Sequence, residues 1–486
     1  MTTLAYESGL QLRKRLVTGD LSAVELLDYF LARVARYNPE LNAIIELQED
    51  EARAQAIACD KAQASQSAQS LPPFHGVPMT IKESFDVRGM HTTRGNPAFK
   101  DHIASTDALA VSRLRKAGAN IFGKTNVPQD LADFQSYNAI YGTTNNPWDT
   151  ERTPGGSSGG SAVAMAAGLS GIENGSDIGG SIRNPAHYCG VFGHKPTWGL
   201  LPPRGHAAPG VLAQSDLAVI GPIARSAADL EALLLAEAGP DEIMASGYRL
   251  DLSQPNFTDL KHLRVAAMVN SPLAPVSQAC ESRVEGVLDI VRHAGGQVNY
   301  DARPDFDLGE GHEVYQNLLW AVMASRSDDA TYAQLAAEVA ALAPDDRSAR
   351  AQNLRARFAT YRDYSTANEA RTHQRWAWHR FFQKYDVMVT PIMATPAFPH
   401  DHQPFGQRTV DVDGAPRPYF EQLFWAGLAI NSYLPASIVP TGTLGGGLPI
   451  GVQIIGPEFG DLKVLRVAKL LELEGLAFVP PPGYDD

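Results

Sequence analysis

Serines set among glycines are the residues of this sequence best suited to do chemistry. Residues 155–161 read GGSSGGS, residues 175–181 read GSDIGGS, and the small, apolar segment 162–168 lies between them. Glycine-rich loops can point several backbone N–H groups in one direction, which suits an anion or a developing oxyanion. A serine inside such a loop is therefore a candidate nucleophile.

Two other interpretations of these loops are weaker. A flexible Gly/Ser linker adjoins polar sequence, whereas both loops adjoin dense apolar sequence. A phosphate-binding loop needs Gly-Lys-Ser/Thr at the start of a helix, and neither loop has it. Residues 118–125, GANIFGKT, do match that pattern, but they form an apolar, strand-like stretch. A nucleophilic serine is therefore a better interpretation of these loops than a linker or a phosphate-binding loop.

A lysine at the end of an expected strand could supply the base. Residues 74–82 predict a buried strand, in which Lys82 follows Met79 and Ile81. Taken alone, a lysine at a strand end is more often a surface charge. A buried lysine loses its charge readily and can act as a base near neutral pH, with an adjacent hydroxyl as its proton donor. Both interpretations of Lys82 remain open at this point.

The elements that must position these residues alternate between strands and helices along the whole chain. A capping box at Ser22 begins a helix that we expect to end at Pro39. The alternation predicts an α/β sheet flanked by helices. Without an internal repeat or a long linker, residues 1–486 are expected to form one domain. Residues 308–382 predict a helical cover that contributes to the substrate pocket, although plain amphipathic packing explains most of their side chains.

Composition and charge narrow the class of protein. The chain has 486 residues, of which 44% are apolar and 20% charged, as in an ordinary soluble enzyme. Its formal charge of −13 argues against a nucleic-acid or anionic-membrane surface. No apolar run reaches the roughly 18 residues of a membrane span, and no signal peptide is recognisable. We therefore expect a cytoplasmic protein.

The cysteines and histidines give no sign of a metal site or a disulfide framework. Cys59, Cys189 and Cys280 are an odd, sparse set that fits reduced thiols, and Cys189 is expected to be a small buried hydrophobe. No Cys/His cluster has zinc-ligand spacing, so no cofactor is expected.

Histidines offer an alternative base that the sequence supports less well. His187 and His194 could complete a serine–histidine pair, but no acid partner is suitably spaced. His312, His400 and His402 lie in polar, Pro-rich or acidic surroundings and are expected at the surface.

Taken together, the motifs resemble those of the amidase signature family. Lys82 and Ser157 are 75 residues apart, and Ser157 and Ser181 are 24 apart, as the family spacing requires. The resemblance implies an α/β fold with a single large mixed β-sheet covered by helices on both faces. The stretches that carry it are residues 75–78 with Lys82, 123–126, 146–148, 155–161, 177–183, 195–197, 221–222 and 447–453.

The resemblance also implies a Ser–cis-Ser–Lys triad made of Ser181, Ser157 and Lys82. Ser181 would attack the amide carbonyl and form an acyl-enzyme. Ser157, preceded by a cis peptide bond, would relay the proton to neutral Lys82 and later protonate the leaving amine.

The same resemblance suggests how the nucleophile loop works. The backbone N–H groups of Ile178, Gly179 and Gly180, with that of the nucleophile itself, would bind the oxyanion. Asp177 and Arg183 are expected to brace the loop by pairing.

The substrate pocket is less well defined. Phe134 and Tyr137 could line it or pack under the Gly-rich loop, and the sequence supports both equally. Residues 126–129 resemble fatty-acid amide hydrolases, in which a residue at the position of Leu131 touches the substrate. Tyr433 stands where the family commonly has glycine, and residues 308–382 show no family pattern.

The resemblance implies hydrolysis of a small carboxylic amide, such as an aryl or alkyl amide, with ester or carbamate side activity, through an acyl-enzyme on Ser181. The partner would be this small molecule, with no nucleic acid and no membrane, and a homo-oligomer stays open. An alternative is the glutaminase subunit of a tRNA-dependent amidotransferase. A binding protein that has lost catalysis is a third, against which the intact triad argues.

Overall fold

A large mixed β-sheet runs through the molecule. The computed structural model describes residues 3–443 and 447–485. Within these residues, eight strands form one sheet in the order β10-β9-β11-β15-β14-β7-β8-β6, in which β9 is parallel to β10 and β11 and the remaining pairs are antiparallel. The strands are β6 (Glu173–Asp177), β7 (Phe192–Lys195), β8 (Val219–Ala224), β9 (Arg264–Ala267), β10 (Gln297–Asn299), β11 (Val387–Thr390), β14 (Ala436–Thr443) and β15 (Pro449–Ile455).

Lys82 lies in a smaller sheet beside the large one. Strands β1 (Ile44–Leu47), β3 (Asn120–Thr125) and β2 (Pro78–Lys82) pair in this order, with β2 parallel to β3. The large mixed sheet is as expected. Within the described residues, an isolated bridge between Met79 of β2 and Ile172, the residue before β6, links the small sheet to the large one. Two short hairpins, β4–β5 (Tyr137–Asn138, Gly142–Thr143) and β12–β13 (Thr409–Val412, Ala415–Pro418), complete the pairing there.

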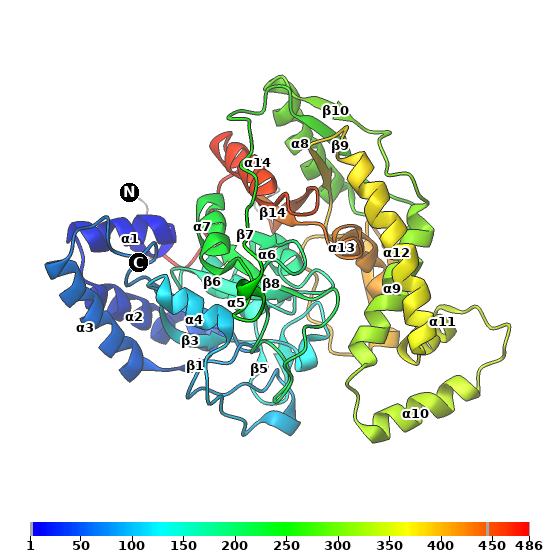
Figure 1. The fold of residues 1–486 in the computed structure, drawn as a ribbon, viewed down its shortest axis with the longest axis horizontal. Helices are drawn as coiled ribbons and strands as arrows, with labels where there is room; N and C mark the ends of the chain where they lie inside the picture. Colours follow the sequence, from blue (N-terminus) through cyan, green and yellow to red (C-terminus); the bar gives the residue numbers. More distant parts are fainter. Residues whose placement is uncertain (1–2, 444–446, 486) are drawn as a thin grey trace.

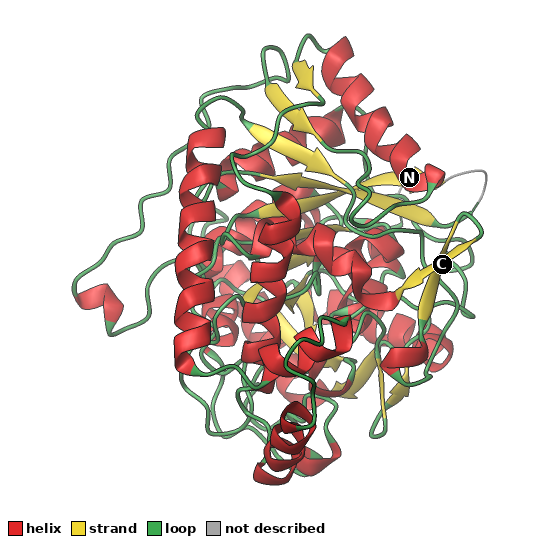
Figure 2. Ribbon diagram, turned by 90° about the vertical axis from the view of Figure 1, so that its right-hand side faces the viewer, coloured by secondary structure: helices red, strands yellow, loops and turns green. Residues whose placement is uncertain are grey.

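Helices cover the strands on both sides (Figure 2). Helix α5 packs on β2 and β6, α6 on β14 and β15, α7 on β8, α14 on β14 and α8 on β15. None of the helices within residues 3–443 and 447–485 combines the length and apolar character that a membrane crossing requires. The helices are α1 (Gly9–Thr18), α2 (Ala23–Leu41), α3 (Glu49–Ser65), α4 (Leu109–Lys116), α5 (Gly159–Ala166), α6 (Arg183–Cys189), α7 (Ala227–Glu237), α8 (Gln278–His293), α9 (Leu308–Ala324), α10 (Asp329–Ala340), α11 (Ala349–Arg357), α12 (Tyr361–Phe381), α13 (Leu423–Ile430) and α14 (Asp461–Leu473).

Helix α2 shows how local sequence sets an element and where the expectation fell short. Ser22 caps its start in a capping box with Glu25, as predicted. The helix does not end at Pro39 but continues to Leu41. Asn42 ends it by adopting a left-handed conformation (φ 47°) and donating its backbone N–H to the carbonyl of Asn38.

The predicted helical segment 308–382 is present as α9 to α12. Helices α9 and α12 lie side by side at one side of the molecule, and α10 and α11 continue this group outward (Figure 1). Together with α13, α9 approaches the loop that follows β6 and carries Ser181, as the contacts below show. Helix α9 of this group therefore belongs to the surroundings of the candidate nucleophile.

Candidate active site

Lys82 points into a group of serine hydroxyls. It ends β2, is fully buried, and its Nζ lies within hydrogen-bond distance of Ser157 Oγ (2.7 Å), Ser158 Oγ (2.9 Å) and Ser176 Oγ (3.0 Å). The interpretation of Lys82 as a surface charge is therefore wrong. Ser176 lies on β6, next to β2, whereas Ser157 and Ser158 precede α5. Two strand ends and a helix start thus converge on one amine.

The surroundings of Lys82 favour its neutral form. Burial lowers the pKa of Lys82 well below its usual range, and the positive charge of Arg94 lowers it further. The carboxylates of Asp177, Glu173 and Glu83 act in the opposite direction, but burial dominates. A neutral amine has two N–H donors and one lone pair, so one of the neighbouring hydroxyls can donate a proton to it.

Ser157 is the hydroxyl best placed to do so. Ser158 Oγ already donates to the carbonyl of Ser176 and accepts its N–H, both at 3.3 Å. Ser157 Oγ, the nearest of the three hydroxyls to Lys82, has Lys82 as its one hydrogen-bond partner within the described residues, as does the more distant Ser176 Oγ. The proton and lone pairs of Ser157 Oγ are therefore available to a second hydroxyl on its other side.

The first Gly-rich loop fits because its glycines have no side chains. The Gly156–Ser157 peptide bond is cis, as the resemblance implied. A Cβ on Gly156 would lie 2.4 Å from the carbonyl oxygen of Asp133, and one on Gly160 would lie 2.4 Å from the backbone nitrogen of Asn126. Such separations are too short for any larger residue, so the loop can pack this deeply only with glycine.

Ser181 lies beside this loop, at the start of the turn that leads into α6. It is 6% exposed, and its carbonyl accepts the backbone N–H of Ser158 at 3.1 Å. The two Gly-rich loops are thus joined directly, next to Ser157. The structure brings Lys82, Ser157 and Ser181 into one buried region, although they are far apart in the sequence.

A buried ion pair braces the Ser181 loop. Asp177 and Arg183 are fully buried and form two hydrogen bonds, of 2.9 and 3.0 Å. Arg183 also donates to Gln453 of β15 at 2.5 Å and to the carbonyl of Ala426 of α13 at 3.2 Å. Burial alone would raise the pKa of Asp177, but the charge and hydrogen bonds of Arg183 lower it to about 2. The expected pairing is confirmed.

The same carboxylate limits which N–H groups can bind an oxyanion. Asp177 accepts the backbone N–H of Gly180 at 2.8 Å and that of Ile182 at 3.1 Å. The structure therefore does not support Gly180 as a free donor, because its N–H already has a partner. The N–H groups of Ile178, Gly179 and Ser181 have no hydrogen-bond partner within the described part of the chain. They are the donors left for an oxyanion.

Replacing Asp177 with Asn should destabilise the protein by about 3–5 kcal/mol, because Arg183 would keep a buried charge without a counter-charge. The wild-type contribution of Asp177 is complete above about pH 3.9, its usual pKa. It is lost as the pH falls towards the folded value of about 2. Denaturant unfolding at several pH values measures both effects.

Asp149→Asn is the matched control for that measurement. The Asp149–Arg152 pair is partly exposed (40% and 33%), so its loss should cost about 1 kcal/mol or less. Equal losses in the two variants would contradict the role given to the buried pair.

Helices α9 and α13 close over the nucleophile loop. Tyr315 of α9 donates its hydroxyl to the carbonyl of Ile178 at 3.0 Å. A Cβ on Gly179 would lie 3.3 Å from Leu423 of α13, and one on Gly180 would lie 3.4 Å from Ala426. The sequence indicated a helical cover here, with amphipathic packing for most of its side chains, but it did not indicate this contact between Tyr315 and the nucleophile loop.

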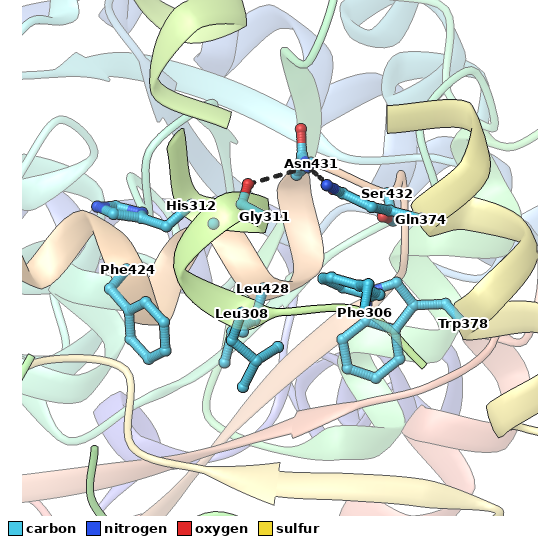
Figure 3. Close-up of a pocket in the computed structure, with 11 residues that line it drawn as sticks. Phe306, Leu308, Gly311, His312, Gln374, Trp378, Phe424, Leu428, Asn431 and Ser432 are labelled. Atoms are coloured by element: carbon cyan, nitrogen blue, oxygen red, sulfur yellow. Dashed lines mark hydrogen bonds between the residues drawn. The ribbon is translucent and has the colours of Figure 1, made fainter. Parts of the chain in front are cut away.

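A small cleft lies on the other side of α13. Figure 3 shows Asn431 bonded to Gly311 and Gln374, with apolar side chains such as Trp378 below it in the view. His312 also lines the cleft and is half-buried, so the expectation that it lies at the surface is wrong. Burial lowers the pKa of His312 to about 4. His400 is likewise half-buried, whereas His402 is exposed. Neither predicted catalytic serine is among the described residues that line this cleft.

The predicted pocket residues are held by the segment that leads into α13. Phe134 is buried against Tyr419 and Phe420, with ring centroids 5.7 and 5.9 Å apart. Tyr137 stacks on His402 at 3.8 Å and accepts a hydrogen bond from Arg408 at 2.6 Å. These contacts favour packing for both.

Leu131, the third predicted pocket residue, is half-buried and has a left-handed backbone (φ 61°). Its role in substrate binding stays a prediction.

The alternative bases lie elsewhere. Both ring nitrogens of His187 meet backbone carbonyls, at 2.9 and 3.0 Å, and those of His194 meet Ser437 and Asp461.

Cys189 is fully buried, as expected. Lys124 lies within β3 and donates to Thr92 at 3.1 Å, so the phosphate-loop pattern falls on a strand.

Comparisons with known proteins agree with this fold. A family model described as amidase matches residues 25–465. A glutamyl-tRNA(Gln) amidotransferase chain of Roseiflexus sp. (strain RS-1) is 32% identical over 484 residues, which cover 94% of this chain and 93% of that protein. The solved structure of 6-aminohexanoate cyclic dimer hydrolase complexed with substrate has a TM-score of 0.79 at 26% identity, covering 99% of this chain and 100% of that one. A bacterial aryl acylamidase of the amidase signature family has a TM-score of 0.81 at 21% identity, covering 98% and 97%, and supports the fold.

The fold and these matches define the class of the protein, a hydrolase that acts on amide bonds. The chain belongs to the amidase signature family, as its motifs indicated.

Proposed function

We propose that the protein hydrolyses a small carboxylic amide through an acyl-enzyme on Ser181. The observation that supports this most is the buried amine of Lys82, 2.7 Å from Ser157 Oγ. A base of this kind needs no histidine, because burial lowers the pKa of Lys82 and so favours the neutral amine that can accept a proton. Aryl or alkyl amides are the proposed substrates, with esters or carbamates as side substrates.

In the proposed acylation step, Ser181 Oγ bonds to the amide carbon while its proton passes to Ser157 Oγ. Ser157 in turn gives its own proton to the lone pair of Lys82 Nζ. When the tetrahedral intermediate collapses, the C–N bond breaks, Ser157 protonates the leaving nitrogen, and Lys82 returns its proton to Ser157. Water then attacks the acyl carbon by the same relay, which releases the carboxylic acid and restores Ser181.

The oxyanion of that intermediate would accept hydrogen bonds from the free N–H groups of Ile178 and Gly179, together with that of Ser181. Such preorganised donors are usually a large part of catalysis, since each lost donor costs about 10²–10³-fold in rate. The Asp177–Arg183 pair supports the proposal by holding the turn that aims these groups. The hydroxyl of Tyr315 holds the carbonyl of Ile178 and fixes the same turn from the other side.

Turnover by the purified chain tests this proposal. A panel of anilides, alkyl amides, peptide amides and carbamates should include at least one amide that the chain hydrolyses alone, without ATP or a partner. A serine-directed fluorophosphonate should add its mass to Ser181. Failure of both the hydrolysis and the labelling would overturn the proposal and favour a binding protein.

A glutaminase subunit of a tRNA-dependent amidotransferase is the second candidate. It is favoured by the similarity to the glutamyl-tRNA(Gln) amidotransferase chain over 94% of this chain. The chemistry on Ser181 would be the same, with glutamine as the amide. Strict dependence of glutamine hydrolysis on partner chains would favour this candidate over the first.

Replacing Ser157 and Ser158 one at a time should separate the relay from its neighbour. Ser157→Ala removes the hydroxyl that would carry the proton, so we expect kcat/KM to fall by about 10²–10⁴-fold. Ser158→Ala removes a hydrogen bond to Lys82 but no transferred proton, and its effect should be at least tenfold smaller. Steady-state kinetics with one amide substrate decides, and a larger loss in Ser158→Ala would contradict the assigned relay.

A further inference from the structure

Arg94 is a charged residue beside Lys82 that the proposed mechanism does not use. The carboxylate of Glu83, the residue after Lys82, is fully buried and accepts the backbone N–H groups of Thr93 and Arg94, the latter at 2.8 Å. On its other side, the carbonyl of Arg94 accepts the N–H of Asp130 at 2.8 Å. Arg94 is therefore fixed between the end of β2 and the segment that carries Leu131.

Arg94 is half-buried, and its guanidinium has few protein partners. Its Nε is buried without a hydrogen-bond partner, and its one side-chain hydrogen bond in the described residues is a long one, 3.5 Å, to the carbonyl of Asp130. No carboxylate lies within ion-pair distance of Arg94 in that part of the chain. The Asp130 carboxylate instead accepts from Asn96 at 2.9 and 3.1 Å. A half-buried charge without a counter-ion is partly desolvated, so an anion from outside the chain would stabilise this arrangement.

The backbone at Arg94 is also unusual. Arg94 has a φ of 56°, in the left-handed region that favours glycine, and its neighbours Asp130 and Leu131 have φ values of 53° and 61°. A left-handed conformation costs a non-glycine residue about 1 kcal/mol or more and often marks a functional position. The fold thus holds an arginine where glycine would be easier, with its side chain largely unpartnered.

The charged groups around Arg94 determine whether it can pair with a negatively charged ligand. Burial lowers the pKa of Arg94, Asp130 and Glu83 raise it, and the positive charge of Arg326 lowers it again. Burial lowers the pKa of His206 well below its usual range, and the charge of Arg94 lowers it further, so His206 supplies no positive charge here. Lys82 itself is neutral in the proposed mechanism. Arg94 is consequently a cation near the proposed base, close enough for its charge to act on Lys82, that can pair with a ligand.

We propose that Arg94 binds a carboxylate on the substrate, so that the preferred substrate of this enzyme is an amide that also carries a carboxylate. The guanidinium fork matches the two oxygens of a carboxylate, and its charge does not depend on pH in the working range. This inference rests on the proposed function, because it assumes that Ser181 attacks the amide of the same molecule.

Matched pairs of amides test the proposal. Glutaramate and valeramide differ by a carboxylate on the acyl side, and N-acetylglycine and N-ethylacetamide differ by one on the amine side. Wild type should prefer the anionic member of at least one pair. Arg94→Met should reduce the ratio of kcat/KM values, anionic over neutral, by about 10- to 100-fold, the worth of a hydrogen-bonded charge. Arg94→Lys keeps the positive charge but not the two-pronged guanidinium, so it should reduce this ratio less than Arg94→Met does.

The ratio of kcat/KM values for the anionic and neutral amides is measured because a general loss of activity lowers both values equally and leaves their ratio unchanged. Arg88→Met is the matched control: Arg88 is an exposed arginine six residues earlier in the same segment, and its replacement should leave the ratio unchanged. A ratio that Arg94→Met does not change, or a wild type without preference for either anionic amide, would overturn the inference. Labelling of Ser181 by a neutral fluorophosphonate, followed by mass spectrometry, separates this outcome from failure of the proposed function itself.

Discussion

Ser181→Ala is expected to lower amide turnover by about 10⁴-fold or more, because the variant has no oxygen at Cβ to form the acyl-enzyme. The fold should stay intact: Ser181 contributes its carbonyl to the link with Ser158, and this backbone contact does not depend on the side chain. Residual activity would come from the remaining N–H donors and from substrate binding. Steady-state kinetics and intact-mass analysis after fluorophosphonate treatment measure the two parts of this prediction.

Ser282→Ala is a suitable control for the labelling. Ser282 is an exposed serine on α8, and its hydroxyl donates to the carbonyl of Gln278 at 2.7 Å. This variant should turn over substrate and gain the label like wild type. A labelled Ser181→Ala protein, or one with near-normal turnover, would show that another residue is the nucleophile.

Lys82→Met should reduce kcat/KM by about 10²–10⁴-fold, the usual contribution of general acid–base catalysis. The sign of the pH effect follows from the lowered pKa of Lys82. Wild-type activity should rise with pH as Lys82 loses its proton, and then stay level through the neutral range. In Lys82→Met this rise of activity with pH should be absent. Measuring kcat/KM as a function of pH in both proteins tests the prediction.

Lys82→Met should also alter stability in a predictable direction. The pKa of Lys82 is lowered by folding, whereas the unfolded chain holds its proton up to about pH 10.4. Between these two values the unfolded state binds more protons, so wild-type stability rises with pH and the variant lacks that part of the slope. Denaturant unfolding at pH 7 and pH 9.5 measures the difference. A variant with normal rates, or with the same pH slope of stability as wild type, would refute Lys82 as a buried neutral base.

The sequence predicted the parts of the site that depend on local pattern. Alternating apolar residues before Lys82 indicated a buried strand, and the Gly-rich motifs indicated loops that present backbone N–H groups around a serine. The Asp177–Arg183 pair followed from the motif and is present as expected. These features are local in the chain, or lie within one motif, which is why sequence reasoning reached them.

The parts that sequence reasoning missed depend on contacts between distant segments. Ser176 meets Lys82 because β6 lies next to β2, although 94 residues separate them in the chain. Tyr315 reaches the carbonyl of Ile178 across 137 residues. Gly180 looked like a free donor until the folded turn placed its N–H on Asp177. No periodicity or spacing in the sequence encodes such meetings.

Tyr433 shows both sides of this limit. The resemblance marked it as standing where glycine is common, and its φ of 62° explains the preference for glycine. What the sequence could not show is that its ring stacks on Trp198 at 4.7 Å and its hydroxyl donates to Asp216 at 2.5 Å. These contacts offset the cost of the left-handed backbone and hold the end of α13.

The protonation state of Lys82 tests the account most directly. In protein labelled with ¹⁵N-lysine, the Nζ resonance that is absent from Lys82→Met can be followed by NMR as the pH changes. We expect it to report a neutral amine at pH 7. An ammonium that keeps its proton up to about pH 10 or above, as an ordinary lysine does, would contradict the proposed chemistry.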